Sequence, residues 1–567
     1  MQPETKSCQN CKKDFTIKSE DFSFYEKIKV PAPTWCPECR MIRRFSFQNT
    51  WSLFWRNCDL CKERTMSVYP PEYNLTVYCS KCWWGDSWDG TEYAMEYDPM
   101  RPFLDQVKEL SEKTPCVAIE SLYSSLKNSE YSNALAWCKD CYQVFWADYG
   151  DTVYYSSIIN NLKYSIDCLR GFRSELCYDS IGIRKNYQTF FSDECSDCVD
   201  VWFSRNCYNC TNCIGCVNLR GASYYIFNVK YTKEDYEKKV KEMNLESWSA
   251  IQAVRQKAYE LWNSFPYREY NGNSLNLNVT GEHVYNSKNS SEVFLVGGVE
   301  NCKWCQIITV KSAKDCYDYS GWGNNASFIY ESAQVGENAN NIKFSTYCYP
   351  DSLDLEYCHY NISGKNNFGC VNLKRKSYCI LNKEYSKEEY EKLKTQIIED
   401  MNKNPYIDKL GRVFSYGEFF PLDLSKFSYN KSNAMRFFPK TKQEAVGEGY
   451  TWDDSENSTV AYTINANDLP DTIKQTSDSV LSEIIGCSLC ARAYKITKGE
   501  LDLMRKLNLP LPHECPKCRE EKRFSRLTKP GMHHRNCMKC NEPIYTPYAP
   551  EDPRIVYCVK CYQAEFA

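Results

Sequence analysis

Sixteen cysteines of this 567-residue chain form eight C-x2-C pairs, four near each end. A two-residue gap lets both sulfur atoms of a pair reach one ion, and soft thiolate ligands favour zinc. Both sets have the spacing C-x2-C-x24-C-x2-C-x18-C-x2-C-x17-C-x2-C, so each cysteine of the second set lies 479 positions after its counterpart. Sequential pairing predicts four structural zinc sites, each closed by four protein ligands: Cys8/Cys11/Cys36/Cys39, Cys58/Cys61/Cys79/Cys82, Cys487/Cys490/Cys515/Cys518 and Cys537/Cys540/Cys558/Cys561. Interleaved pairing fits the same spacing and stays open.

The surroundings of the cysteines favour metal over disulfides. The sequence has no run of about 18 uncharged apolar residues, so we expect no membrane-spanning helix. The start, Met1-Gln2-Pro3-Glu4, has no basic segment followed by an apolar one, so we expect no secretory signal. A cytoplasmic location follows as the expectation, and cysteines there stay reduced.

The terminal modules resemble a known family. The pair Cys8-x2-Cys11, Phe15, the run 20–25, Pro33 and Cys36-Pro37-Glu38-Cys39-Arg40 are similar to the bacterial "probable zinc-ribbon" proteins. The last module repeats the end of this pattern as Cys515-Pro516-Lys517-Cys518-Arg519. The second half of each module, with Val-Tyr-Cys before its final pair, looks like another short bacterial ribbon. The resemblance implies zinc ligands at these cysteines and no activity, and the whole chain looks like a bacterial protein with several zinc ribbons.

Basic residues follow the second pair of each module, beside Phe45 and Phe524. Residues 1–82 carry a net charge of +4 and residues 487–561 carry +7. Two zinc–tetrathiolate sites per module, each formally −2, reduce these values to 0 and +3. Arginine beside aromatic residues is a composition that binds phosphates and stacks on bases. The predicted contact residues for nucleic acid or another partner are Arg40, Arg43, Arg44, Arg519, Lys522, Arg523 and Arg526.

The middle of the chain is also duplicated. The hexapeptide at 215–220 recurs at 369–374, 154 positions later. Thr232 and Ser386 then read as helix N-caps, so a helix should follow each copy. Before each helix, short aromatic, β-branched and cysteine runs recur at about 18–22 residues, which favours a parallel β-solenoid over a sandwich.

These patterns predict a mainly β, multidomain chain in which a duplicated β-solenoid is flanked by two tandem zinc-ribbon modules. The predicted units are 1–84 (tandem ribbon), 85–115 (connecting helical segment), 116–230 (first solenoid half), 231–270 (helix and linker), 271–384 (second solenoid half), 385–402 (helix), 403–485 (aromatic arm and flexible linker) and 486–567 (tandem ribbon).

The remaining eighteen cysteines carry a weaker signal. The densest run is Cys195, Cys198, Cys207, Cys210, Cys213 and Cys216. Three successive two-residue gaps resemble iron–sulfur ligation, but the closing proline and the distant fourth ligand are missing. In the second copy Asn or Gly stands opposite Cys207, Cys210 and Cys213. We therefore favour a ladder of small buried thiols.

No catalytic constellation stands out. Asp193, Glu194, Asp197 and Asp200 form an acidic cluster that solvated turns would explain, and His283 and His359 are isolated in the sequence. The prediction is a zinc-stabilised, non-enzymatic binding or scaffold protein that contacts RNA or a ribonucleoprotein through its basic-aromatic ribbon surfaces. The alternatives are a solenoid enzyme that acts on sugars or acyl groups, and an iron–sulfur or redox protein. Catalytic residues and an oligomeric state are not predicted.

Overall fold

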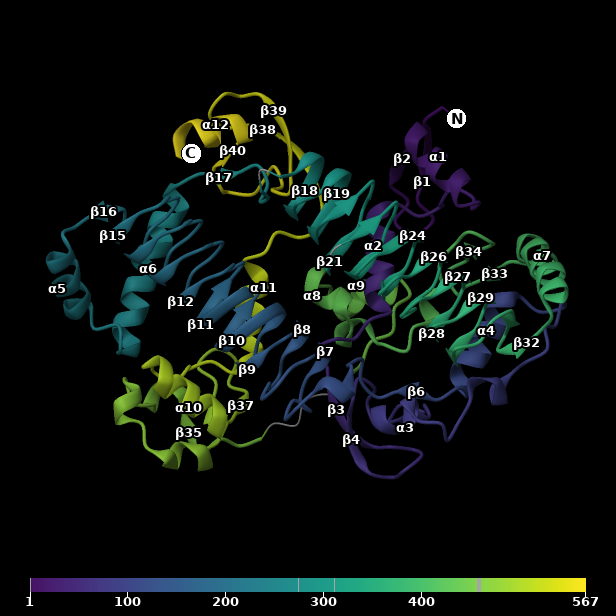
Figure 1. The fold of residues 1–567 in the computed structure, drawn as a ribbon, viewed down its shortest axis with the longest axis horizontal. Helices are drawn as coiled ribbons and strands as arrows, with labels where there is room; N and C mark the ends of the chain where they lie inside the picture. The colour runs from purple at the N-terminus through teal and green to yellow at the C-terminus, as the bar shows by residue number, and fades with distance from the viewer. Residues whose placement is uncertain (1, 274, 311, 456–459, 567) are drawn as a thin grey trace.

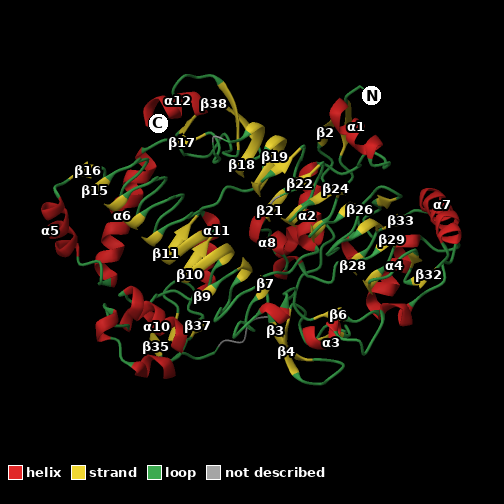
Figure 2. Ribbon diagram, in the orientation of Figure 1, coloured by secondary structure: helices red, strands yellow, loops and turns green. Residues whose placement is uncertain are grey.

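The computed structural model describes residues 2–273, 275–310, 312–455 and 460–566 (Figure 1). The chain is mainly β, with several separate sheets (Figure 2). Its first part contains small hairpins and short helices: β1 (Glu4–Ser7), β2 (Asp14–Ile17), α1 (Ser19–Lys27), α2 (Pro37–Ser46), β3 (Phe54–Asn57), β4 (Arg64–Ser67), β5 (Val77–Tyr78), α3 (Ser80–Trp84), η1 (Gly90–Tyr93), α4 (Phe103–Lys113), β6 (Cys116–Val117) and η2 (Tyr123–Ser125).

A first large sheet follows, with ten strands in the order β16-β15-β14-β13-β12-β11-β10-β8-β7 and β9 paired to β10. Its strands are β7 (Asn133–Ala136), β8 (Phe145–Asp148), β9 (Asp151–Tyr154), β10 (Ser157–Leu169), β11 (Phe172–Ile181), β12 (Tyr187–Phe190), β13 (Val199–Trp202), β14 (Thr211–Ile214), β15 (Ser223–Ile226) and β16 (Val229–Lys230). All pairs except β15–β16 are parallel. Parallel partners lie twelve positions apart in the sequence, as Tyr187 and Val199 do.

The second large sheet has thirteen strands in the order β25-β23-β21-β19-β20-β22-β24-β26-β27-β29-β31-β32, with β18 paired to β19. Its strands, together with the separate pair β28–β30, are β18 (Leu277–Tyr285), β19 (Lys288–Gly297), β20 (Val299–Glu300), β21 (Gln306–Val310), β22 (Ala313–Lys314), β23 (Ser320–Gly323), β24 (Ala326–Tyr330), β25 (Ala333–Gly336), β26 (Asn340–Lys343), β27 (Leu353–Glu356), β28 (His359–Ile362), β29 (Lys365–Phe368), β30 (Val371–Lys374), β31 (Cys379–Ile380) and β32 (Lys383–Glu384). Parallel partners lie 11 to 14 positions apart, from Leu277–Lys288 to Gln306–Ser320.

Left-handed backbone recurs at every third position through the first sheet, from Ala134 to Phe227, with glycine at only three of these positions. Each of these left-handed residues is a corner of the chain. Four corners therefore lie between two residues that pair in neighbouring strands. Stacked corners also bond to one another: Asn206 Nδ2 donates to Asn218 Oδ1 at 3.0 Å. The predicted repeat of 18–22 residues is therefore wrong. The corners are mostly Asn, Asp and aromatic residues, so glycine and proline did not mark the turns.

The helices after each sheet are α5 (Lys233–Met243) and α6 (Trp248–Ser264) in the first copy, and α7 (Lys387–Lys403) in the second. The Thr232 hydroxyl accepts a hydrogen bond from the Asp235 amide, and Ser386 forms a capping box with Glu389. Both N-cap predictions are confirmed. The short strand β17 (Tyr267–Arg268) follows α6 and pairs with the C-terminal module.

The segment between the second sheet and the last module wraps across the molecule as β33 (Tyr406–Ile407), β34 (Val413–Phe414), η3 (Leu422–Leu424), η4 (Tyr429–Lys431), α8 (Asn433–Phe437), α9 (Lys442–Gly447), β35 (Ile464–Asn465), η5 (Ala466–Asp468), η6 (Ile473–Gln475) and η7 (Asp478–Ser482). Phe419, Phe420 and Phe437 are buried. Residues 456–459 of the predicted linker lie outside the described residues, and in its described part Leu469 and Ile473 are buried.

The last module repeats the organisation of the first, with β36 (Ile485–Gly486), β37 (Ala493–Tyr494), α10 (Lys498–Leu507), α11 (Pro516–Ser525), β38 (His533–Asn536), β39 (Pro543–Thr546), β40 (Val556–Tyr557) and α12 (Val559–Phe566).

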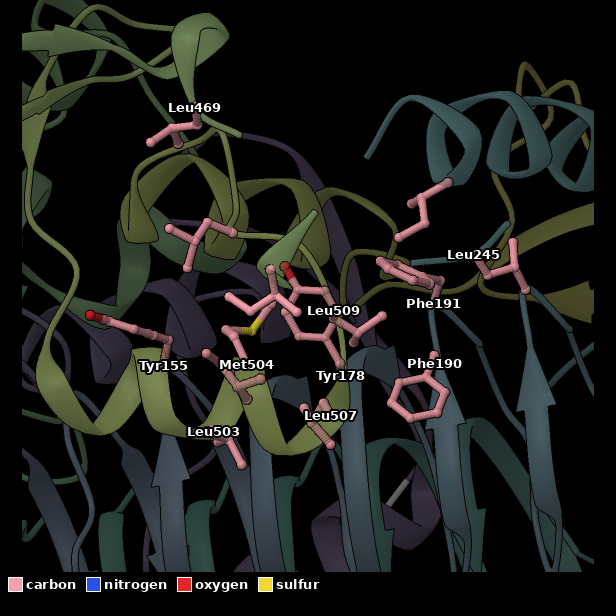
Figure 3. Packing of buried hydrophobic residues seen from close by; sticks show 14 of the residues in the cluster. Tyr155, Tyr178, Phe190, Phe191, Leu245, Leu469, Leu503, Met504, Leu507 and Leu509 are labelled. Atoms are coloured by element: carbon pink, nitrogen blue, oxygen red, sulfur yellow. The ribbon is translucent and has the colours of Figure 1, made fainter. Parts of the chain in front are cut away.

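The two terminal modules pack crosswise on the two large sheets. Met504 and Leu509 of the C-terminal module share a core with Tyr178 of the first sheet (Figure 3). Phe24 of the N-terminal module stacks on Tyr317, between β22 and β23 of the second sheet, with ring centroids 3.8 Å apart. The arginine-bearing helix of each module, α2 or α11, therefore packs on the sheet that is more distant in the sequence.

Candidate metal centres and the residues around them

Four groups of four cysteines are formed, and in each group the sulfur atoms lie within 4.8 Å of one another. The groups are Cys8/Cys11/Cys36/Cys39, Cys58/Cys61/Cys79/Cys82, Cys487/Cys490/Cys515/Cys518 and Cys537/Cys540/Cys558/Cys561. The pairing is sequential, so the geometry removes the interleaved alternative. Groups of this kind fit zinc-ribbon-like modules that could each hold one metal ion.

In each group, a hairpin turn and the start of a helix bring the four sulfur atoms together. The first pair sits in the turn of a hairpin, which a left-handed residue such as Lys12 or Asn541 closes in all four groups. The second pair begins a helix, where Cys36 and Cys515 are N-caps followed by proline at the first helical position. Amides at a helix N-terminus favour negative charge, so this placement stabilises thiolates.

Backbone amides support one thiolate in every group. The amide of the third cysteine donates to the sulfur of the first at 3.2 Å, from Cys36 to Cys8 and from Cys79 to Cys58. The C-terminal groups show the same bond, from Cys515 to Cys487 and from Cys558 to Cys537. Burial opposes ionisation of Cys58, but amides of Cys79, Cys61 and Leu60 together lower its pKa to about 7. Anionic sulfur at neutral pH is the form that a metal ion requires.

The predicted contact arginines of the N-terminal module are buried. Arg40, Arg43 and Arg44 of α2 have no exposed surface and enter the second sheet. Arg40 Nη2 lies 2.7 Å from Asp318 Oδ2, and Arg43 Nη2 lies 2.9 Å from both carboxylate oxygens of Glu331. Arg44 Nη2 lies 3.5 Å from Asp318 Oδ1. The predicted exposure of these three residues is therefore wrong.

The C-terminal module has the same design. Arg519 and Arg523 of α11 are buried and pair with Asp167 of the first sheet, and Arg523 Nη1 lies 2.9 Å from Asp167 Oδ1. Arg526 is partly exposed and pairs with Asp193 at 3.1 Å. Of the seven predicted contact residues, Lys522 alone is exposed, and it pairs with Glu514. An arginine-rich helix has the same local sequence whether it faces solvent or carboxylates from a distant segment, so the sequence did not separate the two cases.

The six central cysteines form a ladder inside the first sheet. Each is at most 1% exposed, and each thiol donates to the carbonyl two residues before it, as Cys198 does to Ser196 at 3.2 Å. Ser165 and Ser192 make the same bond. Within the described residues these cysteines form no group of the kind seen in the terminal modules. Cysteines with two residues between them lie three positions apart, which is the period of the left-handed corners.

The residues considered for catalysis separate into two sets. Asp193, Glu194 and His283 line one cavity of about 480 Å³, whereas Asp197 and Asp200 do not. His283 Nε2 lies 3.3 Å from Glu282 Oε1, and His283 Nδ1 lies 3.7 Å from Glu194 Oε2. His359 lies elsewhere, partly buried against Thr346. No spacing in the sequence marks this convergence, because it joins both halves of the chain.

Comparisons with protein-family models, curated proteins and solved structures find no match for this chain. In the described part of the chain, no helix has both the length and the apolar surface to cross a membrane.

Proposed function

We propose that this chain is a zinc-stabilised, non-enzymatic binding and scaffold protein of the bacterial cytoplasm, and that its partner is single-stranded RNA, free or within a ribonucleoprotein. In this proposal four zinc ions fix the terminal modules, which resemble the bacterial "probable zinc-ribbon" family. The modules hold a duplicated β-solenoid between them. The observation that carries the proposal is a groove that both modules line together.

Zinc is supported by the donor set. A closed group of four cysteine ligands is typical of structural zinc, and it leaves no open position for catalysis. Elemental analysis of protein purified without chelators should give four zinc atoms per chain. Iron in place of zinc, together with visible absorbance, would support the redox alternative instead.

A solenoid is supported by the register of the sheets. Parallel partners lie twelve positions apart in the first sheet, and a left-handed corner occurs at every third position. A chain that turns four times and then pairs with itself in parallel describes one coil. We propose that each large sheet is one face of such a stack of coils, which gives the two modules a rigid support.

The groove has a volume of about 1450 Å³. It is lined by β3 and β4 of the N-terminal module, α11 of the C-terminal module, the edge of the first sheet and α8. Lys431, Arg492 and Lys529 line it, and within the described residues none of them has a carboxylate within 4.0 Å. Phe54 and Tyr131 offer partly exposed rings beside them. Unpaired cations with aromatic rings can bind phosphates and stack on bases.

The test is the affinity for a fluorescent twelve-nucleotide uridine RNA, measured by anisotropy at several salt concentrations. Reversing the charges with Lys431→Glu, Arg492→Glu and Lys529→Glu should weaken binding by at least tenfold. It should also reduce the slope of log K against log salt by about 2, because three phosphate contacts are lost.

The matched control reverses Lys238, Lys239 and Lys241, which are exposed on α5 and lie outside the groove. This variant has the same net charge and should bind RNA like the unaltered protein. Equal loss in both variants, or no RNA binding by the unaltered protein, would contradict an RNA partner in the groove. Association with a protein that is lost only in the groove variant would replace RNA by a protein partner.

One observation favours the alternative of an enzyme that acts on sugars or acyl groups. Glu194, Glu282 and His283 converge on the cavity of about 480 Å³. Burial raises the pKa of Glu282 to about 7, which suits a proton donor near neutral pH. Hydrolysis of p-nitrophenyl glycosides or esters that disappears in Glu282→Gln would establish this function.

A further inference from the structure

The cavity of about 480 Å³ lies where four parts of the chain meet. It is bounded by the first sheet (Asp193, Arg205), α6 (Trp262), the start of the second copy (Glu282) and the C-terminal module (Tyr548). The volume is within the range of small-molecule sites, roughly 300–1,000 Å³. Its lining mixes aromatic faces with several charged side chains, as such sites do.

Several N–H donors on the lining have no partner among the described residues. Arg205 Nε and Nη1, Arg268 Nε and Asn218 Nδ2 are buried atoms of this kind. Arg205 as a whole is only 5% exposed, and its Nη2 donates to the Phe265 carbonyl at 3.3 Å. Its guanidinium lies over the Tyr267 ring at 3.7 Å, which fixes its direction. A buried guanidinium N–H without an acceptor is costly, so the lining favours a ligand that supplies acceptors.

The charges on the lining also favour a ligand that supplies acceptors. Arg526 and Arg554 pair with Asp193 and Asp552. By contrast, Arg205, Arg220 and Arg268 have no carboxylate within 4.0 Å in the part of the chain that the structure describes. Asp193, Glu194 and Glu282 also line the cavity, but Asp193 pairs with Arg526, Glu194 pairs with Arg170, and burial raises the pKa of Glu282 to about 7. The three arginines therefore keep no close counter-ion, which favours an anion.

The corresponding place in the other half of the molecule is filled. The middle copies are offset by 154 positions, so His359 is the counterpart of Arg205. The terminal modules are offset by 479 positions, so Tyr69 is the counterpart of Tyr548. There the side chains of Phe420 and Phe427 leave a space of only about 20 Å³. The fold therefore does not require an open, arginine-lined cavity at this position, and only one copy has it.

We propose that this cavity is a binding site for a small ligand that carries a phosphate or carboxylate group. Arg205 binds the oxyanion from the floor through an N–H group that has no acceptor among the described residues, since its Nη2 already donates to the Phe265 and Pro266 carbonyls. Arg268 and the exposed Arg220 approach from the side and the rim, and Asn218 donates from the sheet. The aromatic lining accommodates the rest of the ligand. This site shares Ser525, Leu527 and Thr528 with the groove that is proposed to bind RNA, but it contains none of the three basic residues of that groove.

The experiment is calorimetric titration of the zinc-loaded full chain with inorganic phosphate and, separately, with malonate. Saturable one-to-one binding of either ion is expected, and the tighter of the two identifies the class of the natural ligand. Arg205→Gln should weaken binding at least tenfold, because a charged hydrogen bond in a buried site is lost. Arg220→Gln should weaken it several-fold without risk to folding, since Arg220 is exposed.

The matched control is Arg173→Gln, an exposed arginine of the same sheet outside the cavity, which should bind like the unaltered protein. The proposal is overturned if neither ion binds in a saturable way, or if Arg205→Gln and Arg220→Gln both bind with unchanged affinity. Because the RNA groove contains neither residue, its charge-reversal variant should retain the binding of these ions.

Discussion

At the scale of single residues, the arginines after each second cysteine pair connect the modules to the sheets. Arg40 and Arg519 occupy equivalent positions, and each meets a buried aspartate of the opposite part of the chain, Asp318 or Asp167. A buried pair of this kind contributes little net stability, but its disruption leaves a charge uncompensated. These contacts therefore specify which surfaces dock.

Removal of one carboxylate from such a cluster should be costly. Asp318→Asn removes the nearer carboxylate from Arg40 and Arg44 and leaves them only Glu331, which Arg43 also uses, so we expect a loss of about 3–5 kcal/mol in the free energy of unfolding. Denaturant unfolding measures the loss. The control is Asp105→Asn, whose carboxylate pairs with Arg101 on an exposed face of α4, where about 1 kcal/mol or less is expected. Similar losses in both variants would contradict the role of the buried cluster.

Glu282 makes stability depend on pH. Burial is the largest cause that raises its pKa from 4.5 to about 7, and the folded state therefore keeps a proton that the unfolded chain releases near 4.5. Stability from this group is fully present below pH 4.5 and is lost as the pH rises to about 7. The groups that face it are Asn271, Glu194, Arg170, His283 and Tyr548.

Glu282→Gln should remove this dependence. Between pH 5.5 and 8 the unaltered protein should lose about 2 kcal/mol of stability relative to the variant, from about 1.5 pKa units at 1.36 kcal/mol each. Thermal unfolding of both proteins across this range measures the difference. A difference that stays constant with pH would show that Glu282 titrates at its ordinary value.

At the scale of elements, the left-handed corners control the large sheets. Asn209 has a φ of 51° and an exposed side chain. A β-branched residue is strained there, so Asn209→Val should cost about 1–2 kcal/mol, whereas Asn209→Gly should cost little. Thr211→Val on the adjacent strand β14 is the control and should be neutral, because that backbone is extended. Denaturant unfolding ranks the three variants, and equal behaviour of Asn209→Val and Asn209→Gly would contradict the strain at this corner.

The sequence predicted the elements that depend on local chemistry. Indel-free spacing gave the cysteine groups, and the caps at Thr232 and Ser386 gave the helices. The coil length escaped prediction, although C-x2-C runs such as Cys207–Cys216 already show the three-residue period. The docking of Arg40 could not be predicted, because its partner Asp318 is 278 positions away and nothing local marks it.

At the scale of the whole molecule, the modules are exchanged between the halves. The N-terminal module packs on the second sheet, and α10 and α11 of the C-terminal module pack on the first (Figure 1). Neither half of the chain therefore contains a complete sheet with its own module. A metal ion at one end should stabilise strands that lie far away in the sequence, and this exchange distinguishes the architecture from a chain of independent domains.

Loss of one zinc site should therefore destabilise the sheet on which that module packs, which lies far away in the sequence. Replacing Cys36 and Cys39 by Ala releases α2, and hydrogen exchange should increase in β23 and β25 of the second sheet, against which the arginines of α2 pack. Replacing Cys515 and Cys518 by Ala releases α11 and should increase exchange in β10 and β11 instead. Each variant is the control for the other, since each loses one site of the same composition. If exchange rises only within the altered module, or equally in both sheets, then the modules do not stabilise the sheets through these contacts.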